Sequence, residues 1–373
     1  MSRRLNFRLL FLLLLLAALA IREVALESRP SFLRPGLHMF AYVGNFGDGT
    51  VSAVDLVALS RSATIATGPS PSGLRPHPTR PEIWGVSTDG GYAWVIDAKL
   101  GRLVSKIPVG ALPYAIDFSP DGSRAYVAAS GANTVVAIDT ATRQVVAEGR
   151  AGHRPWIARA TPDGKLVVVS NRDDATVSLL NAITLAPVAT IGTAPSPEQI
   201  EILPDSSRAF VTSGDVDQIS AIDLTQHVLL ANLAIGGTPS DLVLKPDGGE
   251  LYIPSAKAHG LLIVNTSTIE VGDFLLLGMS PSSGAFDAAD NTLYVTDSAA
   301  GHVVPVNVDT RHVGAPIQVG QNPRDCLTTP GGDLLLVVNS GSNDLAVIRS
   351  KTSALITLAP VGLQPREVAV KVF

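Results

Sequence analysis

The sequence contains little charge and almost no sulfur. Charged residues make up 16% of the 373 positions, aromatic residues make up 5%, and Cys326 is the one cysteine. A single cysteine excludes an intramolecular disulfide, so packing and hydrogen bonds must hold the fold. We expect Cys326 to be a small buried residue rather than a nucleophile. The formal net charge of -5 argues against general nucleic-acid binding.

The common signatures of catalysis are also missing. The sequence contains no GxSxG nucleophile elbow, no phosphate-binding P-loop and no CxxCH haem-attachment site. None of the seven histidines stands at a metal-ligand spacing such as HExxH. Loops would bring His153, His259 and His302 to the same end of the molecule, but no pattern assigns them a metal or a haem. We therefore expect no cofactor and no metal.

The first 38 residues read as an export signal followed by a linker. Three arginines precede an apolar run that ends near Ile21, and Ala18-Leu19-Ala20 places small residues where a signal peptidase reads them. We predict a signal peptide over residues 1–20, cleaved after Ala20, and a linker over 21–38. The apolar run is shorter than the roughly 20 residues of a membrane-spanning helix, although an uncleaved anchor is the alternative. The expected location is the periplasm or the exterior.

The rest of the chain repeats with a period of 42 residues. Proline recurs in one register at Pro71, Pro113, Pro155, Pro197, Pro239, Pro281, Pro323 and Pro365. Thirteen residues after each proline stands a large apolar residue, and the series is Trp84, Tyr126, Val168, Phe210, Tyr252, Tyr294 and Leu336. The eighth member would fall beyond the C-terminus, and Tyr42 near the front takes its place. The repeat is therefore circular.

Each repeat contains four short strands. In the best-formed copy the pattern predicts strands from Tyr114 to Ser119, Arg124 to Ala129, Thr134 to Ile138 and Gln144 to Glu148. Four strands in about 40 residues is the period of a propeller blade. We predict an all-β protein in which residues 39–373 form a single β-propeller of eight four-stranded blades. N- and C-terminal strands close the last blade, which removes an exposed sheet edge, and we expect a monomer.

An acidic or amide side chain recurs at the end of each third strand. The series is Asp55, Asp97, Asp139, Asn181, Asp223, Asn265 and Asn307, and only Arg349 departs from it. We interpret these residues as turn formers, because both Asp and Asn accept hydrogen bonds from backbone N–H groups two residues on. An acid, base or metal site would not accept the two interchangeably.

Several segments resemble the YVTN-type β-propeller repeat. They are Ala41-Tyr42-Val43-Gly44-Asn45, Tyr126-Val127, Thr134 to Asp139 and Ser119-Pro120-Asp121-Gly122, and the similarity covers residues 39–373. The resemblance implies the fold but no single activity, since related propellers include surface-layer proteins, periplasmic binding proteins, lactonases and haem or quinone enzymes. Many relatives have seven blades, and a count of eight is similar to the haem-d1 propeller of nitrite reductase.

The residue after each proline should line one mouth of the central channel. This position varies: it is Ser72, Tyr114, Trp156, Glu198, Ser240, Ser282, Arg324 and Arg366. Arg324 and Arg366 fall on adjacent blades, where they would clamp a carboxylate or phosphate. The alternative is that they pair with Asp325 and Glu367.

A second group of candidate residues belongs to the opposite side of the mouth. Tyr114, Arg154 and Trp156 form an aromatic and basic cluster that suits a flat or sugar-like ligand, although ordinary packing is the alternative. Glu198 and His153 complete the predicted ligand-binding set.

Two functions of different classes remain open from the sequence. The first is an exported, non-catalytic propeller whose channel mouth binds a small anionic molecule, a polymer or an envelope protein. The alternative is an enzyme, such as a lactonase-like hydrolase or a component of a haem- or quinone-linked oxidoreductase. The regular scaffold without a catalytic motif favours the first.

Overall fold

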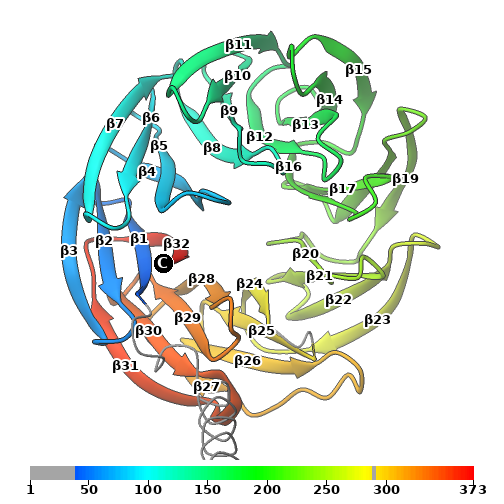
Figure 1. Ribbon diagram of the computed structural model, residues 1–373. Helices are drawn as coiled ribbons and strands as arrows, with labels where there is room; N and C mark the ends of the chain where they lie inside the picture. The colour runs from blue at the N-terminus through cyan, green and yellow to red at the C-terminus, as the bar shows by residue number, and fades with distance from the viewer. Residues whose placement is uncertain (1–37, 288–290) are drawn as a thin grey trace, which may run out of the picture.

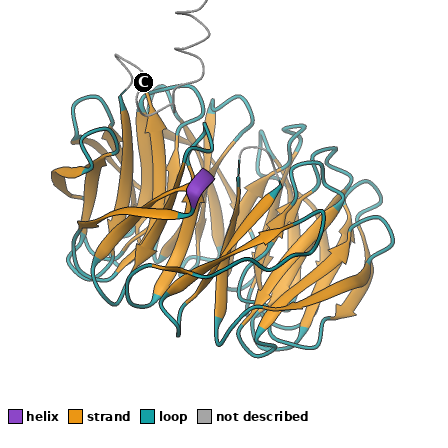
Figure 2. Ribbon diagram, turned by 90° about the horizontal axis from the view of Figure 1, so that it is seen from below, coloured by secondary structure: helices purple, strands orange, loops and turns teal. Residues whose placement is uncertain are grey.

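The computed structural model describes residues 38–287 and 291–373, and these form one closed ring of eight antiparallel sheets with four strands each (Figure 1). This confirms the predicted eight-bladed all-β propeller. The predicted signal peptide, and the predicted linker except for His38, lie outside the described residues. Figure 2 shows the ring from the side, with the strands joined by loops at its two faces.

Every blade runs from an inner strand beside the channel to an outer strand at the rim. The inner strands are β4 (Pro71–Pro76), β8 (Pro113–Phe118), β12 (Pro155–Ala160), β16 (Pro197–Ile202), β20 (Val243–Leu244), β24 (Pro281–Phe286), β28 (Pro323–Thr328) and β32 (Pro365–Val372). The second strands are β1 (Met39–Asn45), β5 (Glu82–Ser87), β9 (Arg124–Ala129), β13 (Leu166–Asn171), β17 (Arg208–Ser213), β21 (Glu250–Ser255), β25 (Thr292–Asp297) and β29 (Leu334–Asn339).

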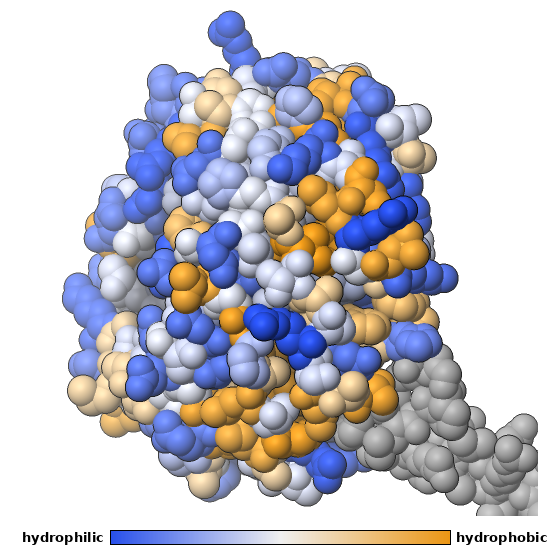
Figure 3. Space-filling model, turned by 90° about the vertical axis from the view of Figure 1, so that its left-hand side faces the viewer, coloured by the Kyte–Doolittle hydropathy of each residue, from blue (hydrophilic) through white to orange (hydrophobic). Residues whose placement is uncertain are grey.

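The two remaining strands of each blade complete the sheet. The third strands are β2 (Thr50–Asp55), β6 (Tyr92–Asp97), β10 (Thr134–Asp139), β14 (Thr176–Asn181), β18 (Gln218–Asp223), β22 (Gly260–Asn265), β26 (His302–Asn307) and β30 (Asp344–Arg349). The outer strands are β3 (Ser60–Ala66), β7 (Arg102–Pro108), β11 (Gln144–Arg150), β15 (Pro187–Gly192), β19 (Val228–Ala234), β23 (Glu270–Leu276), β27 (Ile317–Gln318) and β31 (Ala354–Pro360). The rim around β3, β7 and β31 mixes hydrophilic residues with apolar ones (Figure 3).

The core lies between neighbouring blades. The large residue thirteen places after each proline is buried in all eight blades. Three of the tyrosines at this position also reach the next blade, because the hydroxyls of Tyr42, Tyr126 and Tyr294 donate to carbonyl oxygens 56 residues further on. Each such bond joins two sheets that share no backbone pairing. Cys326 is buried in one of these inter-blade clusters, as predicted.

The two ends of the chain close the ring. Strand β32 pairs antiparallel with β1, so that Tyr42 lies opposite Ala369. The backbone groups of His38 and Phe373 exchange two further hydrogen bonds, at 3.0 and 2.9 Å. The predicted split blade is therefore correct. Within the described ranges, no helix is long and apolar enough to cross a membrane.

The recurring Asp and Asn residues form turns. The Asp139 Oδ1 accepts hydrogen bonds from the backbone N–H groups of Ala141 and Thr142, at 3.0 and 2.7 Å. The equivalent oxygen accepts from a following backbone N–H in the other six copies. Where Arg349 replaces the acceptor, a short 3-10 helix, η2 (Ser350–Thr352), makes the turn instead.

Candidate functional site

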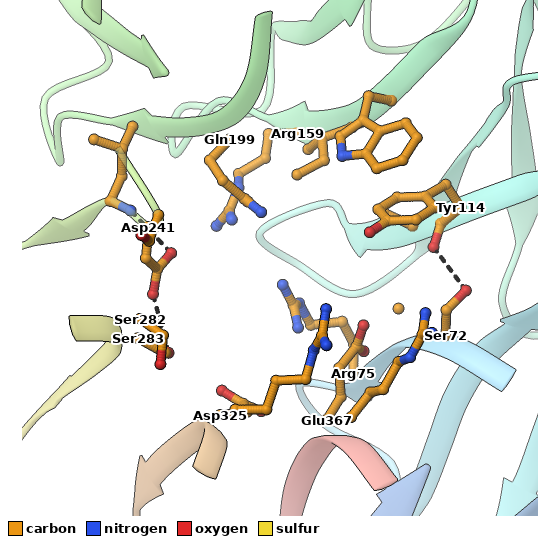
Figure 4. Close-up of a pocket in the computed structure, with 18 of the residues that line it drawn as sticks. Ser72, Arg75, Tyr114, Arg159, Gln199, Asp241, Ser282, Ser283, Asp325 and Glu367 are labelled. Carbon is orange, nitrogen blue, oxygen red and sulfur yellow. Dashed lines mark hydrogen bonds between the residues drawn. The ribbon is translucent and has the colours of Figure 1, made fainter. Parts of the chain in front are cut away.

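A cavity of about 740 Å³ occupies one end of the central channel (Figure 4). Most of its lining comes from the first residues of the inner strands, with Phe46 and a few loop residues at the rim. Because a different blade supplies each part of the wall, the lining varies around the ring while the scaffold repeats. Cavities of this size accommodate small organic ligands.

An irregularity at the start of the inner strands decides which side chains reach the cavity. Strict alternation would send the first and second residues after each proline in opposite directions. In seven of the inner strands the pairing register shifts just after the proline, as it does between Pro323 and Asp325 and between Pro365 and Glu367. A bulge of this kind re-aims side chains. Both Arg324 and Asp325 therefore line the cavity, as do Arg366 and Glu367.

Arg324 and Arg366 do not pair with the acids beside them. In the part of the chain that the structure describes, neither guanidinium lies within 4.0 Å of a carboxylate oxygen. The Glu367 carboxylate instead accepts a hydrogen bond from the backbone N–H of Leu74, 2.8 Å away in the next blade. The ion-pair interpretation of these arginines is therefore wrong.

The Arg366 side chain is held against an aromatic ring. Its guanidinium carbon lies 3.3 Å from the centroid of the Phe46 ring. Burial and the neighbouring charge of Arg324 lower the pKa of Arg366 from its usual value. Two like charges that act on each other favour the approach of an anion that neutralises them. Arg324 itself is exposed at the mouth.

The aromatic cluster forms a second stack. The rings of Tyr114 and Trp156 lie 3.6 Å apart at an interplanar angle of 27°. Two guanidinium groups, those of Arg154 and Arg172, lie 5.6 and 5.1 Å from the Trp156 ring. Burial raises the pKa of the Tyr114 hydroxyl, and Glu367 and Glu198 add to this shift.

Glu198 and His153 lie outside the cavity lining. The Glu198 carboxylate is 3.0 Å from the guanidinium of Arg172, and burial raises the pKa of this carboxyl. The Nδ1 atom of His153 lies 2.7 Å from the Asp174 carboxylate at the exposed rim. The cavity thus unites Arg324, Arg366, Tyr114, Trp156 and Arg154 from the predicted set, while Glu198 pairs with Arg172 and His153 contacts Asp174 outside the lining.

The histidines do not gather at the cavity. His259 Nδ1 lies 2.8 Å from the carbonyl oxygen of Met279, and His302 Nε2 lies 3.7 Å from Asp297. No histidine lines the cavity, and no group of three or more His, Cys, Asp or Glu side chains among residues 38–287 and 291–373 could hold a metal ion.

Sequence reasoning missed several polar residues deeper in the channel. Arg75 and Arg159 come from the fourth position after the proline, and Asp241 and Gln199 come from the second. Figure 4 shows Arg159 and Gln199 on one side of the cavity, with Asp325 and Glu367 across from them and Asp241 at the edge. The sequence did contain a signal for this deeper part of the site, namely charged residues within an inner strand, such as Arg75 and Arg159. A strand that faces only packed core would not carry them.

The deeper carboxyl groups are hard to ionise. Burial raises the pKa of Asp241 to about 6, against hydrogen bonds from Leu242 N–H and Ser283 Oγ that lower it. Burial and the charge of Glu367 raise the pKa of Asp325 to about 7. Arg159 lies 3.4 Å from Glu201. Near neutral pH the cavity therefore holds less negative charge than its carboxyl groups suggest.

The net charge of the cavity lining is opposite in sign to the net charge of the whole chain. Five arginines and four acidic residues line it, whereas the chain carries a formal net charge of -5. The arginines outnumber the acidic residues, and burial raises the pKa of Asp325 to about 7, so the cavity is positive at pH 7. Guanidinium groups with free N–H donors, next to aromatic rings, are suited to bind the carboxylate or phosphate group of an unsaturated organic molecule.

No family model matches the sequence, and a search of curated proteins finds no match. Several solved structures share the fold. A hydrazine synthase from Kuenenia stuttgartiensis is 19% identical, with a TM-score of 0.62 over 75% of this chain and 95% of that one. The dihydro-haem d1 dehydrogenase NirN is 15% identical, with a TM-score of 0.74 over 88% and 74%. AztD from Citrobacter koseri is 12% identical, with a TM-score of 0.67 over 90% and 98%. Identities this low show the propeller fold alone.

Proposed function

We propose that this protein is an exported binding protein that captures a small organic anion in the channel mouth. The observation that carries the proposal is the gathering of five arginines around one cavity in a chain of negative net charge. Guanidinium groups form paired, charge-assisted hydrogen bonds with carboxylates and phosphates, and a partly enclosed cavity strengthens them. Export is part of the proposal and rests on the signal-like sequence of residues 1–20.

Arg324 and Arg366 are proposed as the main anion ligands. Neither guanidinium is neutralised by a nearby carboxylate in the described chain, so a bound anion would meet donors that are not already satisfied by one. The same reasoning does not extend to Arg159, which pairs with Glu201. A YVTN-type origin of the repeat is consistent with this function but does not specify it.

Calorimetric titration with carboxylates and phosphates tests the proposal. Arg324→Ala and Arg366→Ala should each weaken binding by about 1.5–3 kcal/mol, the range for hydrogen bonds to charged groups. The matched control is Arg102→Ala, since Arg102 is exposed on the outer strand β7 and should leave affinity unchanged. Affinity should also fall as salt is added. Equal affinities in the wild type and both mouth variants would contradict the proposal.

An enzymatic role is the second candidate, and Asp325 is the residue that favours it. A carboxyl group with a pKa of about 7 inside a ligand-sized cavity has the properties of a general acid or base. A visible spectrum and metal analysis of protein purified from its host would detect a haem, a quinone or a metal. Detection of any of these would favour the oxidoreductase alternative over the simple binding protein.

A further inference from the structure

Two stacked pairs stand on either side of Ser72 at the channel mouth. The residue after the proline is Arg366 in β32, Ser72 in β4 and Tyr114 in β8, and β4 lies between the other two strands (Figure 1). Arg366 lies over Phe46 on one side, and Tyr114 stacks on Trp156 on the other. All five residues line the same cavity.

Between these stacks, β4 carries the smallest pair of residues that follows the proline in any of the eight blades. After Pro71, strand β4 carries Ser72 and Gly73, whereas every other blade carries at least one larger residue or two hydroxyl-bearing ones at these positions. Gly73 has a φ of +61°, and a Cβ there would lie 2.8 Å from Ala115 Cα, so the backbone requires glycine. The Ser72 hydroxyl is bonded to Thr88 Oγ1 and the Tyr114 carbonyl oxygen, and Ser72 is 6% exposed.

We infer that the part of the cavity between Tyr114 and Arg366, next to Ser72, is a slot for a flat ring, and that the ligand is an aromatic carboxylate. This inference rests on the proposed function. The ring lies against the face of Tyr114, opposite the guanidinium plane of Arg366, because aromatic rings stack on both kinds of surface. Its carboxylate accepts hydrogen bonds from Arg324 on the blade beyond Arg366. A puckered ring of the same size fits such a slot poorly.

Benzoate and cyclohexanecarboxylate are the matched probes for this slot. They carry the same charge on rings of the same number of atoms, and only benzoate is flat. The wild type should bind benzoate about three- to tenfold more tightly, the scale of one aromatic stacking contact. Tyr114→Leu, which keeps an apolar side chain, should abolish this preference. Succinate, which has no ring, serves as the third probe.

Ser72→Phe tests the slot itself, and Ser60→Phe is its control. Ser60 is exposed on the outer strand β3 and does not line the cavity. Filling the slot with Ser72→Phe should weaken benzoate at least tenfold and leave succinate within about twofold, while Ser60→Phe should leave benzoate within about twofold. Circular dichroism and thermal melting establish that each variant is folded.

The outcomes separate the slot from the proposed function. If none of the three anions binds the wild type, the proposed function and the slot both fail. If the anions bind but benzoate has no advantage, the slot is wrong while the proposed function stands. The slot is equally wrong if benzoate binds Ser72→Phe and Tyr114→Leu as tightly as it binds the wild type.

Discussion

The Asp325 carboxylate accepts a hydrogen bond from the backbone N–H of Val368, 3.0 Å away in the neighbouring blade. Glu367 makes the same kind of bond to Leu74 one blade further on. These acids therefore join inner strands that share no sheet. Their arginine neighbours in sequence, Arg324 and Arg366, are left to face the cavity.

We predict that Asp325 makes the fold less stable at pH 8 than at pH 5. Its pKa is raised to about 7 in the folded chain, mainly by burial, against about 3.9 for an unfolded Asp. Between these two values the folded chain keeps a proton that the unfolded chain has released. The free energy of unfolding therefore falls as the pH rises from about 4 to about 7, and the loss is complete above pH 7.

Asp325→Asn should remove most of this pH dependence. The amide keeps an oxygen that accepts from Val368 N–H but carries no charge. The difference in the free energy of unfolding between the variant and the wild type should be roughly 1–3 kcal/mol more favourable to the variant at pH 8 than at pH 5. This range allows for water in the channel, which weakens the effect of burial. Urea unfolding at both pH values measures this difference, with the exposed Asp309→Asn as control. Parallel pH profiles for the wild type and Asp325→Asn would contradict the prediction.

The fold could be predicted from the sequence because its strand and turn patterns repeat. A proline every 42 residues and a buried residue thirteen places later set eight strand registers at once, and Tyr42 supplied the member missing from the end. In the best-formed blade, the predicted strand from Thr134 to Ile138 ends one residue before β10 does. A repeated pattern averages out the local ambiguity of any single strand.

The site could be predicted only in part, because bulges and contacts between blades leave no local pattern in the sequence. The position after the proline lines the cavity at Arg324, Arg366 and Tyr114 but not at Glu198. The register shift that turns Asp325 to the same side has no residue signature of its own. Pairing of Asp325 with Arg324 was an open alternative because the two are adjacent in sequence, whereas the Asp325 carboxylate accepts from Val368 N–H, 43 residues away.

Asp139 tests whether the repeated Asp and Asn residues serve the turns. Asp139→Ala should lower the free energy of unfolding by about 1 kcal/mol, since two backbone N–H groups lose their acceptor. Asp139→Asn should cost only a few tenths of a kcal/mol, because Asn181 and Asn265 already make the same turn. Chemical unfolding measures both. A large loss in Asp139→Asn would show that the negative charge matters beyond the turn.

Cys326 should be unreactive in the folded protein. Its side chain is buried, and burial raises the pKa of the thiol well above its usual value, so little thiolate is present. A chromogenic disulfide reagent should label the thiol only after denaturant is added. The control is Leu112→Cys, which adds a second cysteine at an exposed rim position. The reagent should label this added thiol at once, before any denaturant is present. Rapid labelling of the folded wild type would refute the assignment of Cys326 as a core residue.

Closure of the ring by β32 should carry a large share of the stability. Deleting residues 365–373 removes the inner strand of one blade and exposes the edge of β1, which invites pairing with other chains. It also removes Val368 and Val370 from a buried cluster shared with the neighbouring blade. We expect the truncated protein to aggregate or to melt at least roughly 10 °C lower, since a loss of several kcal/mol shifts the melting temperature by a few degrees for each kcal/mol.

A rearranged chain separates loss of the strand from loss of its connection. Residues 365–373 are moved in front of His38, and a short linker joins Phe373 to His38, which already exchange backbone hydrogen bonds. The chain then ends at Gln364, in the loop before Pro365. This protein keeps every strand pairing and should melt within a few degrees of the wild type, because only loop-closure entropy changes. If the truncated chain melts like the wild type, or the rearranged chain is as unstable as the truncated one, pairing of β32 with β1 is not what holds the ring closed.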